Sequence, residues 1–411
     1  MAHPILSLWL LVSRLGPHAC GQGAPDQENL PTAVTPPASS TFLNNSHFAF
    51  SLYRHMVAPN PSRNILFSPL SFTIPLTLLA LKANADVRTQ VLQGLGFSPT
   101  RVPDNQAHVH YSQLLRGLLP PAGECRTDTG SILFVGQKQI VLPKFTDLAQ
   151  NLYLTEVSFT CFKNFQTARD QMDHFTRKKT HGKIGTLVQD LKADTVLILA
   201  NYMFFKGKWK YRFDPKLTEL RPFSLSQELT ILVPTMLRLG WFQLQRLYHL
   251  HSYALQLPLI CNSTAVFILP DMGKVRETEE GLVNENFDTW TQPFPLSRRR
   301  LYFPKFSLPG NFQLDHPVTE TGISDLFSCH AGISGISLQI MPMKVSQVEQ
   351  GVELTVDEEG AEEEDITNLW SFPMSLIPAI HFNRPFLLLV FEESSHNLLF
   401  MGKVMNPNAK S

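Results

Sequence analysis

Apolar residues near the start of the chain repeat with the spacing of an α-helix. Phe48, Leu52 and Met56 recur every four residues, which predicts a helix capped by the polar residues at 44–46. Two further helices are predicted at 71–81 and 165–179. Pro75 lies early in the first of these, where proline is tolerated in the first turn and disruptive deeper in a helix.

A different pattern marks the later part of the chain. The run 196–205 is almost continuously apolar and contains aromatic residues, which predicts a strand buried on both faces. Three more strands are predicted at 129–136, 386–391 and 398–404. Because helices dominate early and strands dominate late, the sequence favours an α+β fold over a doubly wound α/β fold.

The composition fits a folded protein with a large core. Hydrophobic residues make up 43% of the 411 residues and charged residues 17%, which argues against global disorder. The formal net charge is zero, so no overall field attracts nucleic acid or an anionic membrane. No later run reaches the roughly 18 apolar residues needed to span a bilayer. We expect a monomer with neither a nucleic-acid nor a membrane partner.

The first residues have the pattern of a secretory signal peptide. An apolar run at 5–12 is followed by small residues close to position 20, so residues 1–21 are predicted to direct export. The alternative interpretation is a short buried helix. Residues 22–43 are rich in proline, alanine, serine and threonine and are predicted to form a flexible leader. We therefore expect a secreted, extracellular protein.

The cysteines are widely separated and include no Cys-x-x-Cys pair, which argues against a zinc site. They are Cys20, Cys125, Cys161, Cys261 and Cys329. Because a core of this size does not need disulfides, we interpret the cysteines mostly as buried thiols and leave their pairing open. We expect no metal and no cofactor.

Two Asn-x-Ser/Thr sequons are present, at Asn44 and Asn262. In an exported chain both asparagines could carry glycans, which would place them at the surface. The protein is therefore expected to be a glycoprotein.

One segment is strongly acidic. Seven of the nine residues from Asp357 to Asp365 are aspartate or glutamate. The segment follows a strand-like stretch at 352–356 and precedes an apolar, proline-bearing stretch at 369–378. Taken alone, this pattern is typical of a solvated acidic loop.

Several segments together resemble the serpin family, and within it the antitrypsin group. They are 64–71 (NILFSPLS), 201–209 (NYMFFKGKW) with 213–215 (FDP), 262–270 (NSTAVFILP), 382–386 (FNRPF) and 400–407 (FMGKVMNP). The resemblance runs from about 44 to 410. It implies an α+β domain at 44–411 with three β-sheets, about eight or nine helices and an exposed reactive-centre loop at about 360–381.

The resemblance also implies a mechanism. In inhibitory serpins a protease cleaves the loop, and the freed strand inserts into the central sheet with the acylated protease attached. By this resemblance Gly360 opens the hinge and the bait bond is Met374–Ser375. The flexible, uncharged Met374 suits a serine protease with an apolar specificity pocket, elastase-like or chymotrypsin-like. The chain itself is expected not to be an enzyme.

The hinge departs from the family pattern. It comprises Glu358, Glu359, Gly360, Ala361, Glu362, Glu363, Glu364 and Asp365, where inhibitory serpins carry small residues. Alternation along an inserted strand would put at least two carboxylates on the face toward the core in either register. Burying each unpaired ion costs on the order of several kcal/mol. We therefore expect slow insertion and the behaviour of a substrate rather than an inhibitor.

Three other residues depart from the family pattern and one pair keeps it. Gln350 replaces a histidine beneath the central sheet, Glu353 stands at a normally apolar position, and Pro75 intrudes near the same region. Lys305 and Glu358 keep a pair that bridges the top of the sheet in antitrypsin-like serpins. The resting fold is thus expected to be better preserved than its transition.

Two function classes remain. The first is a secreted serine protease inhibitor whose inhibition is impaired by the acidic hinge. The second is a non-inhibitory serpin, acting as a carrier or a cleavable substrate, or a product under relaxed functional constraint. The basic run Arg298–Arg300 is interpreted as a solvated turn rather than a polyanion site.

Overall fold

The computed structural model describes residues 45–96, 109, 112–113, 125–188, 190–192, 194–328, 331–333, 335–337, 343–362 and 376–409. All of them belong to one compact unit, Thr41–Ser411. The expected signal peptide, the leader, Asn44 and the bait bond lie outside the described residues. Within these ranges, no helix is both long and apolar enough to cross a membrane.

The described residues form eight α-helices and two short 3-10 helices. They are α1 (Ser46–Val57), α2 (Pro69–Ala80), α3 (Ala85–Gly94), α5 (Pro143–Tyr153), α6 (Phe165–Lys179), α7 (Val275–Leu282), α8 (Asp288–Thr291), α9 (Asp315–Glu320), η1 (Pro215–Leu217) and η2 (Asp325–Phe327). The helix predicted at 165–179 is confirmed. The helix predicted at 71–81 begins at Pro69, because the Ser68 hydroxyl accepts a hydrogen bond from the backbone N–H of Ser71 and caps the helix.

Helix α1 has Asn45 immediately before its first residue. Asn45 occupies the cap position, but its side chain makes no capping hydrogen bond. It pairs instead with the backbone of Leu398, donating to the carbonyl at 3.1 Å and accepting from the N–H at 2.7 Å. Asn45 therefore does not cap the helix as predicted, because its side chain ties the helix to a strand.

Helix α2 continues through Pro75, which lies beyond the first turn. A proline there lacks the N–H that would bond the carbonyl of Ser71. All twelve residues of α2 are buried, so tertiary packing holds the helix despite the lost hydrogen bond.

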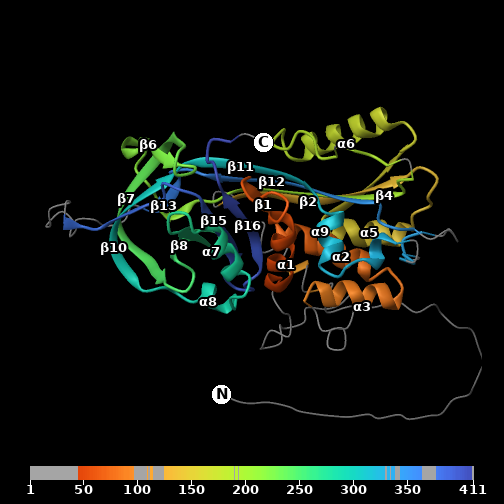
Figure 1. Ribbon diagram of the computed structural model, residues 1–411. Helices are drawn as coiled ribbons and strands as arrows, with labels where there is room; N and C mark the ends of the chain where they lie inside the picture. Colours follow the sequence, from red (N-terminus) through yellow and green to blue (C-terminus); the bar gives the residue numbers. More distant parts are fainter. Residues whose placement is uncertain are drawn as a thin grey trace, which may run out of the picture. The chain divides into compact units, whose positions relative to one another are not determined.

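The central sheet has five strands. In spatial order they are β11 (Phe306–Gln313), β12 (Gln347–Val356), β4 (Leu197–Lys206), β2 (Arg126–Gly136) and β3 (Thr155–Thr160). Strands β12 and β4 are parallel neighbours, paired from Gln347 opposite Ile198 to Thr355 opposite Lys206. We call this pairing the seam. Figure 1 shows α6 on one side of the sheet and α1, α2 and α5 on the other.

The remaining strands form one eleven-stranded sheet. They are β1 (Ile65–Phe67), β16 (Leu398–Val404), β15 (Phe386–Glu392), β9 (Ser263–Pro270), β8 (Ser252–Leu259), β7 (Thr230–Leu247), β10 (Leu296–Pro304), β14 (Ala379–His381), β5 (Trp209–Tyr211), β6 (Glu219–Ser224) and β13 (Gly360–Glu362). The α+β class is confirmed. The described strands form two sheets rather than three, because the long strand β7 pairs in turn with β6, β10 and β8 and so joins them.

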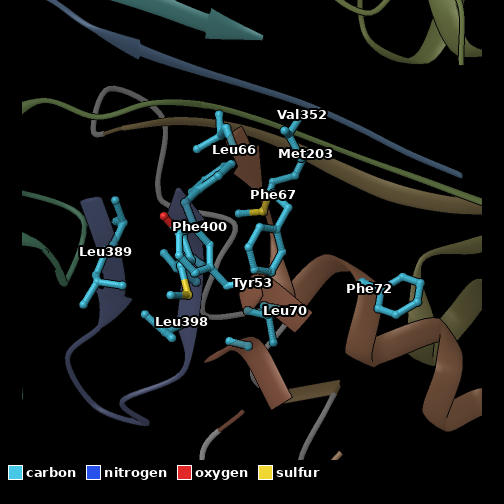
Figure 2. Packing of buried hydrophobic residues seen from close by; sticks show 14 of the residues in the cluster. Tyr53, Leu66, Phe67, Leu70, Phe72, Met203, Val352, Leu389, Leu398 and Phe400 are labelled. Carbon is cyan, nitrogen blue, oxygen red and sulfur yellow. The ribbon is translucent and has the colours of Figure 1, made fainter. Parts of the chain in front are cut away.

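Both faces of β4 are covered by apolar side chains, as predicted. Leu199, Met203 and Phe205 belong to the main core beneath the sheet. The alternate residues Ile198, Ala200 and Tyr202 belong to a second cluster that also contains side chains of α6 and of the segment after it. Figure 2 shows Met203 and Val352, from the two strands of the seam, directed toward the main core near Phe67. A strand inserted at the seam would therefore be covered on both faces.

The interpretation of the cysteines as buried thiols was wrong for the three that the structure describes. Cys125 and Cys261 form a disulfide, with their Cα atoms 5.6 Å apart. Cys161 is a free thiol and is exposed. Pairing could not be read from the sequence, because these two positions are 136 residues apart and meet only through the packing of two sheets.

Candidate functional site

The candidate site begins where the seam ends. Arg126, Lys206 and Thr355 stand opposite one another at one end of β2, β4 and β12. We call this the hinge end of the central sheet. The chain leaves β12 here, passes through 357–359 and forms the short strand β13.

The first hinge residues are docked on another strand. Strand β13 pairs in parallel with β5, with Gly360 opposite Trp209. The Trp209 N–H donates to the carbonyl of Glu359 at 3.0 Å, and its indole N–H donates to the carbonyl of Asp357 at 2.7 Å. A Cβ on residue 360 would lie 2.6 Å from the Cα of Arg212, so this close approach requires glycine. The loop expected from 360 thus starts as a paired strand.

Two lysines pair with the three acids that lead into β13. Lys206 Nζ lies 2.7 Å from a carboxylate oxygen of Asp357 and 2.8 Å from one of Glu359. Burial lowers the pKa of Lys206, but the hydrogen bonds that its ammonium donates to Asp357 and Glu359 outweigh burial and leave this pKa raised. The second lysine, Lys305, lies 2.7 Å from Glu358. We call these five residues the hinge clamp.

Glu358 has the least exposed side chain of the five residues in the hinge clamp. Its side chain is 11% exposed, and it accepts hydrogen bonds from Lys305 and from the hydroxyl of Thr218 at 2.8 Å. Burial raises the pKa of Glu358, but these hydrogen bonds outweigh burial and leave this pKa lowered. The carboxylate therefore stays ionised where the chain turns out of β12.

Beneath the middle of the seam lies a neutral hydrogen-bonded cluster around Gln350. Its amide nitrogen donates to the Ser68 carbonyl at 2.9 Å, to the Asn201 side chain at 2.8 Å and to the Ser71 hydroxyl at 3.2 Å. Its amide oxygen accepts from the Ser68 N–H at 3.0 Å. Gln350 thus uses both ends of its amide, although it departs from the family pattern. We call this the seam cluster.

Two glutamates on the other face of β12 have different surroundings. Glu353 is half-buried and accepts a hydrogen bond from the Ser307 hydroxyl at 2.9 Å, so it does not disrupt the strand. Glu349 is 3% exposed. Burial, then the negative charges of Asp315 and Asp190, raise the pKa of Glu349 to about 9. The seam therefore contains a carboxyl that is neutral at pH 7.

The far end of the segment expected to form the reactive-centre loop is also anchored. Residues Ala379–His381 form β14, paired in parallel with β10, and the Arg300 N–H donates to the Pro378 carbonyl at 3.0 Å. Arg300 Nε donates to the Ile377 carbonyl at 3.0 Å. The run Arg298–Arg300 lies within β10, so its interpretation as a turn was wrong. The three arginines are half-buried and pair with residues 239–241 of β7.

The structure brings together only part of the expected site. It places Glu358, Glu359, Gly360 and Ala361 at the hinge end, beside Lys305. The side chain of Glu362, the residues Glu363, Glu364 and Asp365, and the bait residues Met374 and Ser375 lie outside what the structure describes. Asn262 is exposed in the turn between β8 and β9, and its amide nitrogen donates to Glu392 at 2.6 Å.

Sequence reasoning missed the docking strand and Lys206. A signal was present, because basic residues occupy alternate positions from the end of β4 to just past β5. They are Lys206, Lys208, Lys210 and Arg212. Opposite charges on neighbouring strands stabilise pairing, so this alternation could have been matched to the acidic run that begins at Asp357.

The comparisons with known proteins agree with this geometry. A family model described as "Serpin (serine protease inhibitor)" matches residues 43–407. An alpha-1-antitrypsin-like protein of Ictidomys tridecemlineatus is 38% identical over 372 residues, which cover 90% of each chain. Alpha-1-antitrypsin of Meriones unguiculatus is 37% identical over 364 residues, which cover 89% of each chain.

A solved structure has the same fold. Human thyroxine-binding globulin complexed with thyroxine matches with a TM-score of 0.81 and 31% identity, covering 89% of this chain and 98% of that one. The central sheet with its hinge end, the family match over most of the chain and these relatives lead to one conclusion. The chain belongs to the serpin family of serine protease inhibitors.

Proposed function

We propose that this protein is a secreted serpin that offers Met374–Ser375 to an elastase-like or chymotrypsin-like serine protease, and that it is cleaved more often than it traps. The proposal rests on its family, on the uncharged Met374 and on the acidic hinge. The pair Lys305–Glu358 and the rest of the hinge clamp hold the uncleaved form.

One observation carries the proposal. Both faces of the seam are covered by separate apolar clusters, with Met203 and Phe205 on one face and Ala200 and Tyr202 on the other. Hinge residues 361–368 would have to enter between these clusters if the loop inserted. In either register at least two carboxylates would meet apolar surroundings, at a cost on the order of several kcal/mol each. Insertion also requires breaking the hinge clamp first.

The experiment compares the protein before and after its loop is cut. Wild-type protein is incubated with an elastase-type and a chymotrypsin-type protease, and a denaturing gel separates cleaved product from any covalent complex. We expect cleavage at the bait bond, active protease, and a small change in Tm on cleavage. The variant E362A/E363A/E364A/D365A should gain about 10 °C or more when cut, because its loop can insert.

The matched control is E277A/E280A, which removes acids from the surface of α7 and should behave like the wild type. A covalent complex with wild-type protein, or a large rise in its Tm after cleavage, contradicts the impaired trap. No cleavage by either protease contradicts the bait assignment.

Export is part of this proposal and has independent support. The disulfide between Cys125 and Cys261 is typical of proteins that fold in an oxidising compartment. Asn262 is exposed and can display a glycan, and Asn44 is the second expected acceptor. Peptide mapping of protein secreted from mammalian cells, with and without glycosidase, tests both sites.

One cavity favours a second candidate function, which is the binding and transport of a small molecule. A cavity of about 420 Å³ lies between α1 and the segment 283–287. Phe50 and Phe287 contribute apolar surface to it, and His47 and Arg54 contribute polar groups. Thyroxine is the probe, because thyroxine-binding globulin was solved with it. Saturable quenching of tryptophan fluorescence that Arg54→Ala weakens supports a carrier, and the absence of saturation rejects thyroxine carriage.

A further inference from the structure

The disulfide lies at the hinge end and joins the two sheets. Cys125 directly precedes β2 of the central sheet, and Cys261 lies in the turn between β8 and β9 of the larger sheet. Because Arg126 stands opposite Lys206 and Lys206 stands opposite Thr355, the disulfide is level with the opening through which the hinge leaves.

The chain segment between β4 and β5 lies against the disulfide. The Lys208 N–H donates to Cys125 Sγ at 3.3 Å, and the Lys208 carbonyl accepts from the Ile260 N–H at 3.0 Å. Trp209 then pairs with Leu259 of β8. The ends of β2 and β4 are thus fastened to the β8–β9 turn by one covalent bond and by backbone hydrogen bonds.

Insertion requires these strands to move. Strand β12 is paired with β11, which continues from β10 of the larger sheet through Lys305. Strands β2 and β3 lie on the other side of the seam with β4. A new strand between β4 and β12 needs one extra strand spacing, about 4.8 Å, so the β2–β4 side must move away from β12.

The disulfide leaves little room for this movement at the hinge end. Its Cα atoms are 5.6 Å apart, and disulfides extend to about 6.8 Å between Cα atoms. The slack of about 1 Å is much smaller than a strand spacing. Cys125 can move by a full spacing only if the β8–β9 turn moves with it, which would disturb the pairing of both strands with their neighbours.

We propose that the Cys125–Cys261 disulfide is a strap that slows opening of the seam at the hinge end. This inference rests on the proposed function, since it concerns entry of a strand at the same place. It is separate from the acidic hinge: the acids make the inserted state costly, whereas the strap limits the rate at which the sheet opens. Removing the strap should speed strand uptake even when the entering strand carries no acids.

The experiment uses an external strand as the probe, so the chain's own hinge is not involved. The probe is a synthetic peptide of residues 361–374 in which the four acids at 362–365 are replaced by alanine. Its uptake into uncleaved full-length protein is followed over time by native mass spectrometry as a one-to-one complex. We compare wild type, the variant C125S/C261S and the control C161S, which removes the exposed free thiol.

We expect C125S/C261S to take up the peptide at least about tenfold faster than wild type and C161S. The proposal is contradicted if C125S/C261S takes up the peptide at the same rate as wild type. It is also contradicted if C125S/C261S takes up no peptide. Intact-mass analysis that finds Cys125 and Cys261 alkylated in unreduced protein contradicts it as well. If the double variant does not fold, wild type is reduced with dithiothreitol, which donates two electrons and two protons to the disulfide and is itself oxidised to a cyclic disulfide, and the two protein thiols are then alkylated.

The two proposals fail in distinguishable ways. The impaired trap fails if cleaved wild type with its native hinge gains a large rise in Tm, which is an equilibrium property of the cut protein. The strap proposal fails if the rate of peptide uptake is the same with and without the disulfide. This outcome does not depend on whether the native hinge inserts after cleavage.

Discussion

The middle of the seam and its hinge end are held by different kinds of interaction. In the middle, the seam cluster joins Gln350 to Ser68 and Asn201 through neutral hydrogen bonds between fully buried groups. At the hinge end, Lys206 and Lys305 hold three carboxylates in a partly exposed setting.

This difference indicates which end of the seam should open more easily. Breaking a buried neutral cluster leaves several groups without partners, and each costs about 1–3 kcal/mol. Exposed ion pairs contribute about 0–1 kcal/mol each and weaken in salt. The hinge end is therefore the weaker end electrostatically, and the disulfide beside it supplies a restraint that salt does not affect.

The largest expected effect is at the seam cluster. Gln350→Ala leaves the N–H and carbonyl of Ser68 and the side chain of Asn201 without this partner in a dry interior. We expect a loss of about 3 kcal/mol in the free energy of unfolding, measured by urea denaturation. Glu353→Ala on the same strand, which loses one half-buried hydrogen bond, is the control and should cost less than about 1 kcal/mol. A similar loss in both variants would contradict the comparison.

The next effect concerns Glu349, the more deeply buried of the two glutamates of β12 in the seam. Burial, above all, raises the pKa of Glu349 from its usual 4.5 to about 9 in the folded protein. The folded state therefore keeps a proton that the unfolded chain releases, and its contribution to stability is lost as pH rises from about 4.5 to about 9. By pH 7 the loss is on the order of 3 kcal/mol.

Glu349→Gln removes this titration and keeps the shape of the side chain. We expect the variant to be more stable than wild type at pH 8 and nearly equal to it at pH 4.5, measured as Tm across that range. Glu353→Gln is the matched control on the same face of β12. A difference between Glu349→Gln and wild type that stays constant with pH would show that folding does not raise the pKa of Glu349.

The smallest effect is at the hinge clamp. Lys206→Ala leaves Asp357 and Glu359 without their shared cation, and we expect a loss of about 1 kcal/mol locally. Hydrogen exchange of the backbone at 357–362 should become several times faster, and 1 M salt should have a similar effect on wild type. Exchange at the seam cluster should not change.

Lys210→Ala is the control, because this lysine lies on β5 beside the ring of Tyr211 rather than in the clamp. If salt accelerates exchange equally at the clamp and at the seam cluster, the two regions are not held in different ways.

The acidic hinge and the bait bond could be proposed from the sequence because their signals are local. Seven acids within 357–365 are visible without any structure, and the motifs that flank the loop fix its length. The same holds for α6 and β4, whose apolar spacing lies within one segment. The sequence also showed that burying those acids would be costly, whichever register the strand took.

Contacts between segments that are distant in the sequence could be identified only in the folded structure. Gln350 and Ser68 are 282 positions apart, and Cys125 and Cys261 are 136 apart, so neither partner could be named from local pattern. The sequence shows that Gln350 departs from the family pattern, but only the folded structure shows that both ends of its amide are hydrogen-bonded. Local periodicity determines which face of an element is buried, whereas the identity of the partner on that face depends on how separate elements pack.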